Sequence, residues 1–200
     1  MSFGSVSNHT MLARVRAAEA WETFTCTGEG GYPDSLRPHD DHMITQVATG
    51  LFGVREETIQ RVRIVEFKYA QGAKPGLGGH LLGDKVTPAV ARMREAVAGS
   101  ALFSPFPFHS VYSIEDHAKH IDWIKEINPR ALVTVKVSTP TDVDMVAVGS
   151  YHAGAHIVPV GQAQVEHQQV GRFAAQGMEA RLCIGGNQDA VAGLLQVVPH

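Results

Sequence analysis

The sequence predicts an α/β fold built around a parallel sheet. Segments of strand character alternate with segments of helical character along the 200 residues, as expected of successive β–α units. A second observation is the run 131–137, Ala-Leu-Val-Thr-Val-Lys-Val, which is rich in β-branched residues and almost continuously apolar. Such runs are typical of parallel strands that are buried on both faces.

The individual elements follow from local signals in chain order. We expect strands at 43–48, 64–70, 101–104, 131–137, 155–160 and 181–184, and helices at 8–24, 56–62, 88–97, 114–128, 142–152, 165–176 and 190–197. Two helix starts are marked clearly. Thr87 is a suitable N-cap residue directly before Pro88. Ser113 is an equally suitable N-cap, with a carboxylate three residues later at Asp116, and the Asn-Pro pair at 128–129 ends that helix.

The expected helix at 114–128 has the most regular apolar face. That face carries Ile114, Ala118, Ile121 and Ile124, at the spacing of an amphipathic helix. We expect it to pack inward and expect His117 and His120 to lie on the opposite, solvent-facing side. The chain contains 11 histidines, but none has a convergent carboxylate at ligand spacing, so no metal site is expected.

Composition and charge argue against several classes of protein. The hydrophobic content of 44%, the charged content of 18% and the formal net charge of −3 are typical of a soluble globular protein. No basic run indicates a nucleic-acid partner, and no apolar run is long enough to span a membrane. Cys26 and Cys183 are the only cysteines, so neither a disulfide framework nor a cysteine-bound cluster is expected. The N-terminus lacks the features of a signal peptide, and we expect a cytoplasmic setting.

A glycine-rich loop at 71–79 follows the apolar run that starts at Ile64. Its sequence is Gln-Gly-Ala-Lys-Pro-Gly-Leu-Gly-Gly. Lys68 and Lys74 place positive charge beside a backbone that glycine allows to approach a ligand closely. The pattern suits a cradle for an anionic small molecule, and it is equally compatible with a tight structural turn.

Polar and glycine-rich loops follow successive strands, at 27–31, 71–79 and 105–112. This favours a barrel over an open doubly wound sheet, because barrels bind ligands at the carboxyl ends of their strands. Glu29 could act as an acid, a base or a substrate-orienting group, or it could be a solvated loop carboxylate. Lys136, inside an apolar strand, either points into the site or extends its amine to solvent. His109, in the loop after a strand, is a further candidate.

Seven motifs, in order along the chain, carry a resemblance to a known family. They are Met-Ser-Phe-Gly-Ser-Val-Ser at 1–7, Thr-Gly-Glu-Gly-Gly at 27–31, Gln-Val-Ala-Thr-Gly-Leu-Phe-Gly-Val at 46–54, the glycine-rich loop at 71–79, Lys-Val-Thr-Pro at 85–88, Tyr-Ser-Ile-Glu-Asp at 112–116 and Val-Lys-Val at 135–137. In order and spacing they closely resemble the FMN-binding domain of glutamate synthase. The match extends to about Ala155.

The resemblance implies a (β/α)8 barrel of the TIM type that binds FMN. Members of the family reduce 2-iminoglutarate, formed from 2-oxoglutarate and ammonia, to L-glutamate. Carried over by position, the FMN-binding residues are Ser2, Gly4, Ser5, Thr27, Gly28, Gly30, Lys68, Gln71 and Lys136. Gln71, Lys74 and His109 are assigned to the substrate, and Lys74, Lys136 and Glu29 to catalysis. Lysines near a flavin and a dicarboxylate stabilise the charge of the reduced ring and hold the substrate.

Three departures from the family pattern shape this expectation. Leu77 stands where the large bacterial and plant enzymes usually carry Glu, which indicates the archaeal-type branch. The cysteines of the family's iron–sulfur cluster are absent. After position 160 the family's Asp-Gly-Gly-Thr-Gly-Ala loop and phosphate-binding segment are replaced by divergent sequence, in which Gly185 and Gly186 are candidates for phosphate contact.

A complete barrel needs about 250 residues, so we expect an incomplete one. Residues 1–160 would form the glutamate synthase-like barrel segment, and residues 161–200 a divergent β/α segment of the same domain. The expected function is that of an FMN-dependent oxidoreductase in glutamate biosynthesis. The alternatives are a non-catalytic subunit or interaction module and a homologue acting in methylamine–glutamate transfer. Expected partners are 2-oxoglutarate or a glutamate-like molecule, electron-donor and amidotransferase subunits, and a second copy of the chain, because open strand edges invite pairing.

Overall fold

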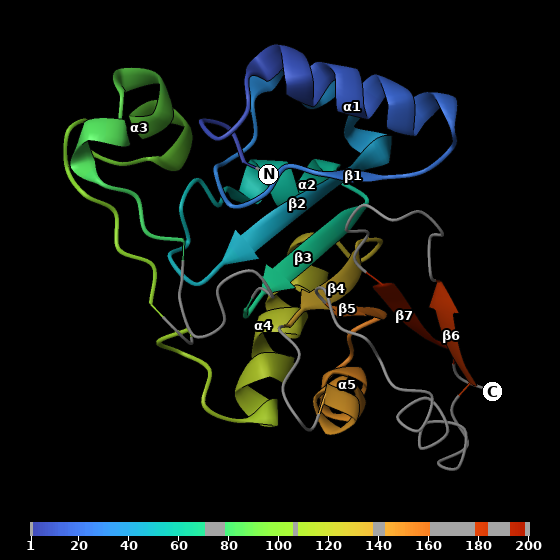
Figure 1. Ribbon diagram of the computed structural model, residues 1–200. Helices are drawn as coiled ribbons and strands as arrows, with labels where there is room; N and C mark the ends of the chain where they lie inside the picture. Colours follow the sequence, from blue (N-terminus) through green and yellow to red (C-terminus); the bar gives the residue numbers. More distant parts are fainter. Residues whose placement is uncertain are drawn as a thin grey trace.

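The computed structural model describes residues 2–70, 79–105, 108–137, 143–160, 179–183 and 193–198. Within them one sheet has the strand order β1-β2-β3-β4-β5-β7-β6 (Figure 1). The strands are β1 (Thr25–Cys26), β2 (Met43–Ala48), β3 (Ile64–Lys68), β4 (Leu132–Lys136), β5 (Ile157–Val160), β6 (Glu179–Cys183) and β7 (Gly193–Val198). Strands β1 to β5 pair in parallel. The chain is therefore an α/β protein whose parallel sheet is consistent with an incomplete barrel.

Helices connect the parallel strands. They are α1 (Asn8–Ala20), α2 (Glu56–Arg61), α3 (Pro88–Arg94), α4 (Ile114–Ile127) and α5 (Val143–His152), with 3-10 turns η1 (Asp34–His42) and η2 (Gly83–Lys85). In Figure 1, α1 lies along the β1 side of the sheet, whereas α4 and α5 lie beside β4 and β5. Helix α4 packs against both α2 and α5. Among the described residues no helix is long and apolar enough to cross a bilayer.

The two faces of the sheet differ in chemistry because side chains alternate along a strand. On one face Val47, Phe67 and Val135 are register partners in β2, β3 and β4, and they belong to the core that includes Ile121 and Ile124 of α4. On the other face the partners form two polar rows, Gln46–Glu66–Thr134 and Ala48–Lys68–Lys136. Helix α4 therefore covers the apolar face, and the polar face is the one that a barrel would enclose.

The expected helix starts are confirmed. The Thr87 side chain accepts a hydrogen bond from the Val90 amide, and the Ser113 hydroxyl accepts one from the Asp116 amide. Both hydroxyls satisfy amides that lack partners within the first helical turn. The local signals at these positions therefore fix where α3 and α4 begin.

Several sequence-based boundaries and one element were wrong. Helix α1 ends at Ala20, before 24, and α3 ends at Arg94 because Glu95 adopts a left-handed conformation with φ of 54°. The expected strand at 101–104 is reduced to one bridge between Leu81 and Leu102. The expected helix at 165–176 lies outside the described residues.

The expected helix at 190–197 is wrong: Gly193–Val198 forms β7. This strand pairs antiparallel with β5 and β6, so the sheet is not parallel throughout. The reason is that the segment Gly-Leu-Leu-Gln-Val-Val is a short apolar run. Periodicity alone cannot distinguish a buried strand from a buried helix in such a run, and pairing with the neighbouring strands decides.

Asn128 ties the loop that precedes β3 to the loop that precedes β4. Its buried side-chain amide donates to the carbonyls of Ile59 at 2.8 Å, Gln60 at 3.3 Å and Val62 at 3.0 Å. Its side-chain oxygen accepts a bond from the Arg130 amide at 3.2 Å. One side chain therefore satisfies backbone groups of two connections that are far apart in sequence.

Replacing Asn128 with Ala should lower the free energy of unfolding by about 2–3 kcal/mol, because buried carbonyls would lose their donors. Urea denaturation at neutral pH measures the change. The matched control is Gln60→Ala, which removes an exposed amide side chain bonded only to Glu56 and should change stability by less than about 0.5 kcal/mol. Equal effects of the two variants would contradict the structural role given to Asn128.

Candidate active site at the carboxyl ends of the strands

Lys68 and Lys136 stand side by side at the carboxyl ends of β3 and β4. They are register partners, and both lie on the polar face of the sheet. Lys68 is buried, with 9% of its surface exposed, and Lys136 is half-buried. In parallel α/β sheets this end of the strands is where ligands bind. The structure therefore places two sequence-predicted cations together at the expected end of the sheet.

Glu29 neutralises one of these cations. Its Oε2 accepts a bond from Lys68 Nζ at 3.0 Å, and the two side chains are only 12% and 10% exposed. Its carboxylate also lies against the backbone of Gly79, where a Cβ atom would come within 1.5 Å of Oε1. The reading of Glu29 as a solvated loop carboxylate is therefore wrong. The pair joins the loop at 27–31 to the end of β3.

The N-terminal turn lies against the same loop. The Ser2 carbonyl accepts bonds from the amides of Ser5 at 3.0 Å and Val6 at 3.2 Å. A Cβ atom at Gly30 would lie 2.9 Å from Ser2 Cβ, so this close approach requires glycine. Within the turn Ser2 is buried, whereas Gly4 and Ser5 are exposed.

Arg94 is a site residue that the sequence analysis missed. The residue is 5% exposed, and its Nη2 donates to Ser2 Oγ at 3.5 Å. Nε and Nη1 are buried and have no hydrogen-bond partner among the described residues. Burial lowers the pKa of Arg94 and the nearby Glu29 carboxylate raises it; arginine stays charged in proteins. A buried cation with unused donors is a suitable binding group for an anion.

A sequence signal for Arg94 did exist. It lies four residues after Val90, on the same face of α3, and both residues are buried. A charged residue on the buried face of a short helix is rarely left without a partner.

Thr27 and Gly28 connect strand β1, which ends at Cys26, to Glu29 in the site loop. Thr27 is 1% exposed, and its hydroxyl donates to the Gly28 carbonyl at 3.0 Å. The Gly28 amide donates to Cys26 Sγ at 3.3 Å. Burial, followed by the charge of Glu66, raises the pKa of the Cys26 thiol to about 12. Cys26 is therefore a neutral thiol at physiological pH and no nucleophile.

The remaining predicted site residues are not brought to this cluster. Gln71 and Lys74, with Gly185 and Gly186, lie outside the described residues. His109 is exposed, and no hydrogen bond or ion pair connects it to another residue that the structure describes. Over the described ranges, no group of three or more His, Cys, Asp and Glu side chains is arranged to hold a metal ion.

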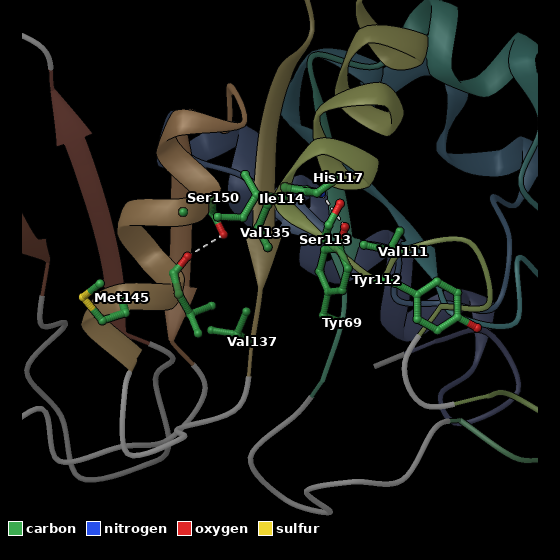
Figure 2. A pocket seen from close by; sticks show the side chains of 12 residues that line it. Tyr69, Val111, Tyr112, Ser113, Ile114, His117, Val135, Val137, Met145 and Ser150 are labelled. Atoms are coloured by element: carbon green, nitrogen blue, oxygen red, sulfur yellow. Dashed lines mark hydrogen bonds between the residues drawn. The ribbon is translucent and has the colours of Figure 1, made fainter.

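A separate cavity of about 630 Å³ lies on the helix side of the sheet. Figure 2 shows its walls, which come from the ends of β3 and β4 and from α4 and α5. They are mainly apolar and include Val111, Ile114, Val135, Val137, Met145 and Val146. Such walls offer no cation to a dicarboxylate. The candidate active site is therefore the charged cluster on the opposite face.

The expected orientation of α4 is wrong in one respect. His117 is buried, 6% exposed, while Ile114 is 54% exposed. The reason is a polar partner: the Tyr69 hydroxyl and His117 Nδ1 are hydrogen-bonded at the wall of the cavity (Figure 2). His120 is half-buried and stacks on Phe67. Burial, helped by the nearby His120, lowers the pKa of His117 to about 4.

These features define a class of protein. The chain is an α/β protein that gathers buried cations at the carboxyl ends of parallel strands, and such a site suits an anionic ligand. Comparison with known proteins then identifies the family. The family described as a conserved region in glutamate synthase matches residues 1–164, and the chain belongs to it.

Individual relatives agree with this assignment. The archaeal glutamate synthase [NADPH] of Methanocaldococcus jannaschii is 42% identical over 161 residues, which cover 80% of this chain and 32% of that protein. The archaeal-type glutamate synthase [NADPH] of Thermotoga maritima is 44% identical over the same shares. The glutamate synthase [NADPH] large chain of Azospirillum brasilense is 45% identical over 138 residues, 66% of this chain and 9% of that protein. The chain thus spans about a third of the archaeal-type relatives it matches.

The buried His117 should make stability depend on pH. The unfolded chain takes up a proton near pH 6.5, whereas the folded protein resists protonation at this position down to about pH 4. Stability should therefore fall as pH decreases through that window, by about 3 kcal/mol at its lower end. Urea denaturation at a series of pH values measures the slope.

The variant His117→Gln should reduce this slope by about one proton. Replacing the exposed His9 with Gln should leave the slope unchanged. An unaltered slope in the His117 variant would show that this histidine is not held neutral by the fold.

Proposed function

We propose that the chain is the FMN-binding part of a glutamate synthase-like oxidoreductase that reduces 2-iminoglutarate to L-glutamate. The observation that carries the proposal is the cluster of Glu29, Lys68, Lys136 and Arg94 at the carboxyl ends of the parallel strands. Membership of the glutamate synthase family supports the same reaction. The substrate and the flavin phosphate are both anions, and this cluster supplies the opposite charge.

The residues present fit FMN. Lys68 and Lys136 are register partners at the carboxyl ends of β3 and β4, and these cations suit the negative charge of the FMN phosphate and of the reduced flavin ring. The residues proposed to hold the cofactor are Ser2, Gly4, Ser5, Thr27, Gly28, Gly30, Lys68, Gln71 and Lys136. When bound, FMN supplies the reducing equivalents for the reaction.

The protein's own side chains hold the substrate and place charge. Arg94 has two buried nitrogens, Nε and Nη1, without hydrogen-bond partners among the described residues, and a charged guanidinium donates strong hydrogen bonds to a carboxylate. We assign Arg94 to one carboxylate of 2-oxoglutarate, with Lys74 and Gln71 as further substrate contacts. Glu29 fixes the Lys68 ammonium in position. Lys136, which has no anionic partner among the described residues, stabilises negative charge that develops on the reduced ring.

Most of each archaeal-type relative lies outside the region that matches this chain. The names of the archaeal-type relatives specify NADPH, and another relative, from Cyanidium caldarium, is named a ferredoxin-dependent glutamate synthase. We assign the chain partners that deliver electrons and, from an amidotransferase, ammonia. The other reading is a non-catalytic barrel segment or interaction module.

A direct test separates these two readings. The purified chain should absorb in the flavin region or bind added FMN with a rise in melting temperature. Chemically reduced flavin on the protein should be reoxidised anaerobically only when 2-oxoglutarate and ammonium are both present. Absence of FMN binding would reject the enzyme reading for this chain, and binding without reoxidation would support the non-catalytic one.

Lys136→Met should weaken FMN binding about tenfold or more, because it removes a half-buried cation from the site. Fluorescence titration of FMN measures the dissociation constant. The control is Lys119→Met, which removes a lysine that is 76% exposed on α4 and should leave affinity within about twofold. Equal affinities for the two variants would remove Lys136 from the site.

Arg94→Gln should weaken 2-oxoglutarate binding at least tenfold while changing FMN affinity much less, because the lost donors face the substrate carboxylate. Arg94→Lys should restore only part of the affinity, since an ammonium cannot form the two parallel bonds. Titration of the FMN-bound protein with 2-oxoglutarate measures both. Arg92→Gln, an exposed change on the same helix, should have no effect, and a wild-type affinity in the Arg94 variants would contradict the assignment.

A further inference from the structure

A cavity lined by charged side chains lies at the opposite end of the strands from the candidate active site. Its volume is about 350 Å³, and its walls are Asp41, Arg61, Val62, Arg63, Asn128 and Arg130. Arg63 directly precedes β3, and Arg130 lies two residues before β4. Lys68 and Lys136 stand at the other ends of these two strands. The cavity is therefore separate from the site assigned to FMN and 2-oxoglutarate.

We propose that this cavity binds a diphosphate group. Three arginines and one carboxylate, that of Asp41, line the cavity. Arg61 is ion-paired with the neighbouring Asp40, so the two other arginines and Asp41 leave an excess of positive charge. Arginine is the side chain best matched to phosphate oxygens, because its planar fork donates two parallel hydrogen bonds. The volume accommodates a compact polyanion, and the polar walls do not suit an apolar ligand.

The donors of two of these arginines are unused by the protein. Arg63 lies over the Phe24 ring, with its guanidinium carbon 5.8 Å from the ring centre, a contact that leaves the N–H groups at the edge of the guanidinium available. Neither Arg63 nor Arg130 forms a side-chain hydrogen bond or ion pair with another described residue. Arg61 is different: it is 25% exposed, and its Nη1 lies 3.6 Å from Asp40. Arg63 and Arg130, whose side chains are exposed to solvent, therefore supply the binding donors, whereas the charge of Arg61 is offset by Asp40.

The walls of the cavity are held in place before any ligand arrives. Asn128 bonds three carbonyls of the 59–62 segment and the amide of Arg130. The Leu132 amide also donates to the Arg63 carbonyl at 2.9 Å. The backbones that carry the two free arginines are thus cross-linked, so less ordering is needed when an anion binds.

The proposal is tested by calorimetric titration of the whole chain with pyrophosphate. Arg63→Gln and Arg130→Gln should each weaken binding about tenfold, and both together about a hundredfold, as expected for charge-assisted hydrogen bonds. Asp41→Asn should strengthen binding several-fold, because it removes the one negative charge in the walls. This opposite sign is a readout that loss of folding cannot imitate.

Two controls separate this cavity from other phosphate sites. Arg16→Gln removes an exposed arginine elsewhere and should leave the affinity unchanged, as should Arg94→Gln in the candidate active site. Titration with ADP identifies the source of the group: tighter binding than pyrophosphate indicates a nucleotide, and equal binding an inorganic diphosphate. Undetectable pyrophosphate binding, or equal losses in the Arg16 and Arg130 variants, would overturn the proposal. Failure of FMN or 2-oxoglutarate binding would leave it standing, since those tests concern the other end of the strands.

Discussion

The ion pair between Lys68 and Glu29 is the interaction on which the candidate site depends. Thirty-nine positions separate the two residues, and each would be a buried, unpaired charge without the other, at a cost of several kcal/mol. The pair therefore fixes the 27–31 loop against the end of β3. Ser2 lies against that loop, and Arg94 bonds Ser2. One buried charge pair thus sets the positions of three segments that are distant in sequence.

The polar face of the sheet explains why such a pair is tolerated. The rows Gln46–Glu66–Thr134 and Ala48–Lys68–Lys136 alternate along the strands with the apolar partners of the helices. Gln46 donates to Glu66, so the row Gln46–Glu66–Thr134 satisfies some of its own hydrogen-bonding groups. A doubly wound sheet, with helices on both sides, would bury apolar side chains on both faces. Polar rows on one face are instead suited to the lining of a ligand site.

Much of the fold could be predicted from local signals, and the failures have a common cause. The bounds of β2 at Met43–Ala48 and the N-caps Thr87 and Ser113 were predicted correctly, because propensity and capping are encoded within a few residues. His117 was placed on the wrong side of α4, since its burial depends on Tyr69, which is 48 positions away. Strand β7 was missed because only pairing with β5 and β6 distinguishes it from a helix. The site residues Glu29, Lys68 and Lys136 came from resemblance and loop position, whereas Arg94 required the packed helix to be seen.

The register between β3 and β4 decides which face of the sheet Lys136 occupies. Opposite faces of a strand exchange roles when pairing shifts by one residue. A single inserted residue between Asn128 and Leu132 would turn Lys136 toward α4 and bring Val135 to the polar face. Pro129 and Arg130 in this connection are exposed, and most surface loops tolerate changes of length. Here, however, a change of length could shift the register of β4 and so displace Lys136 at the far end of the strand. Its length therefore helps to decide which face of the sheet Lys136 occupies.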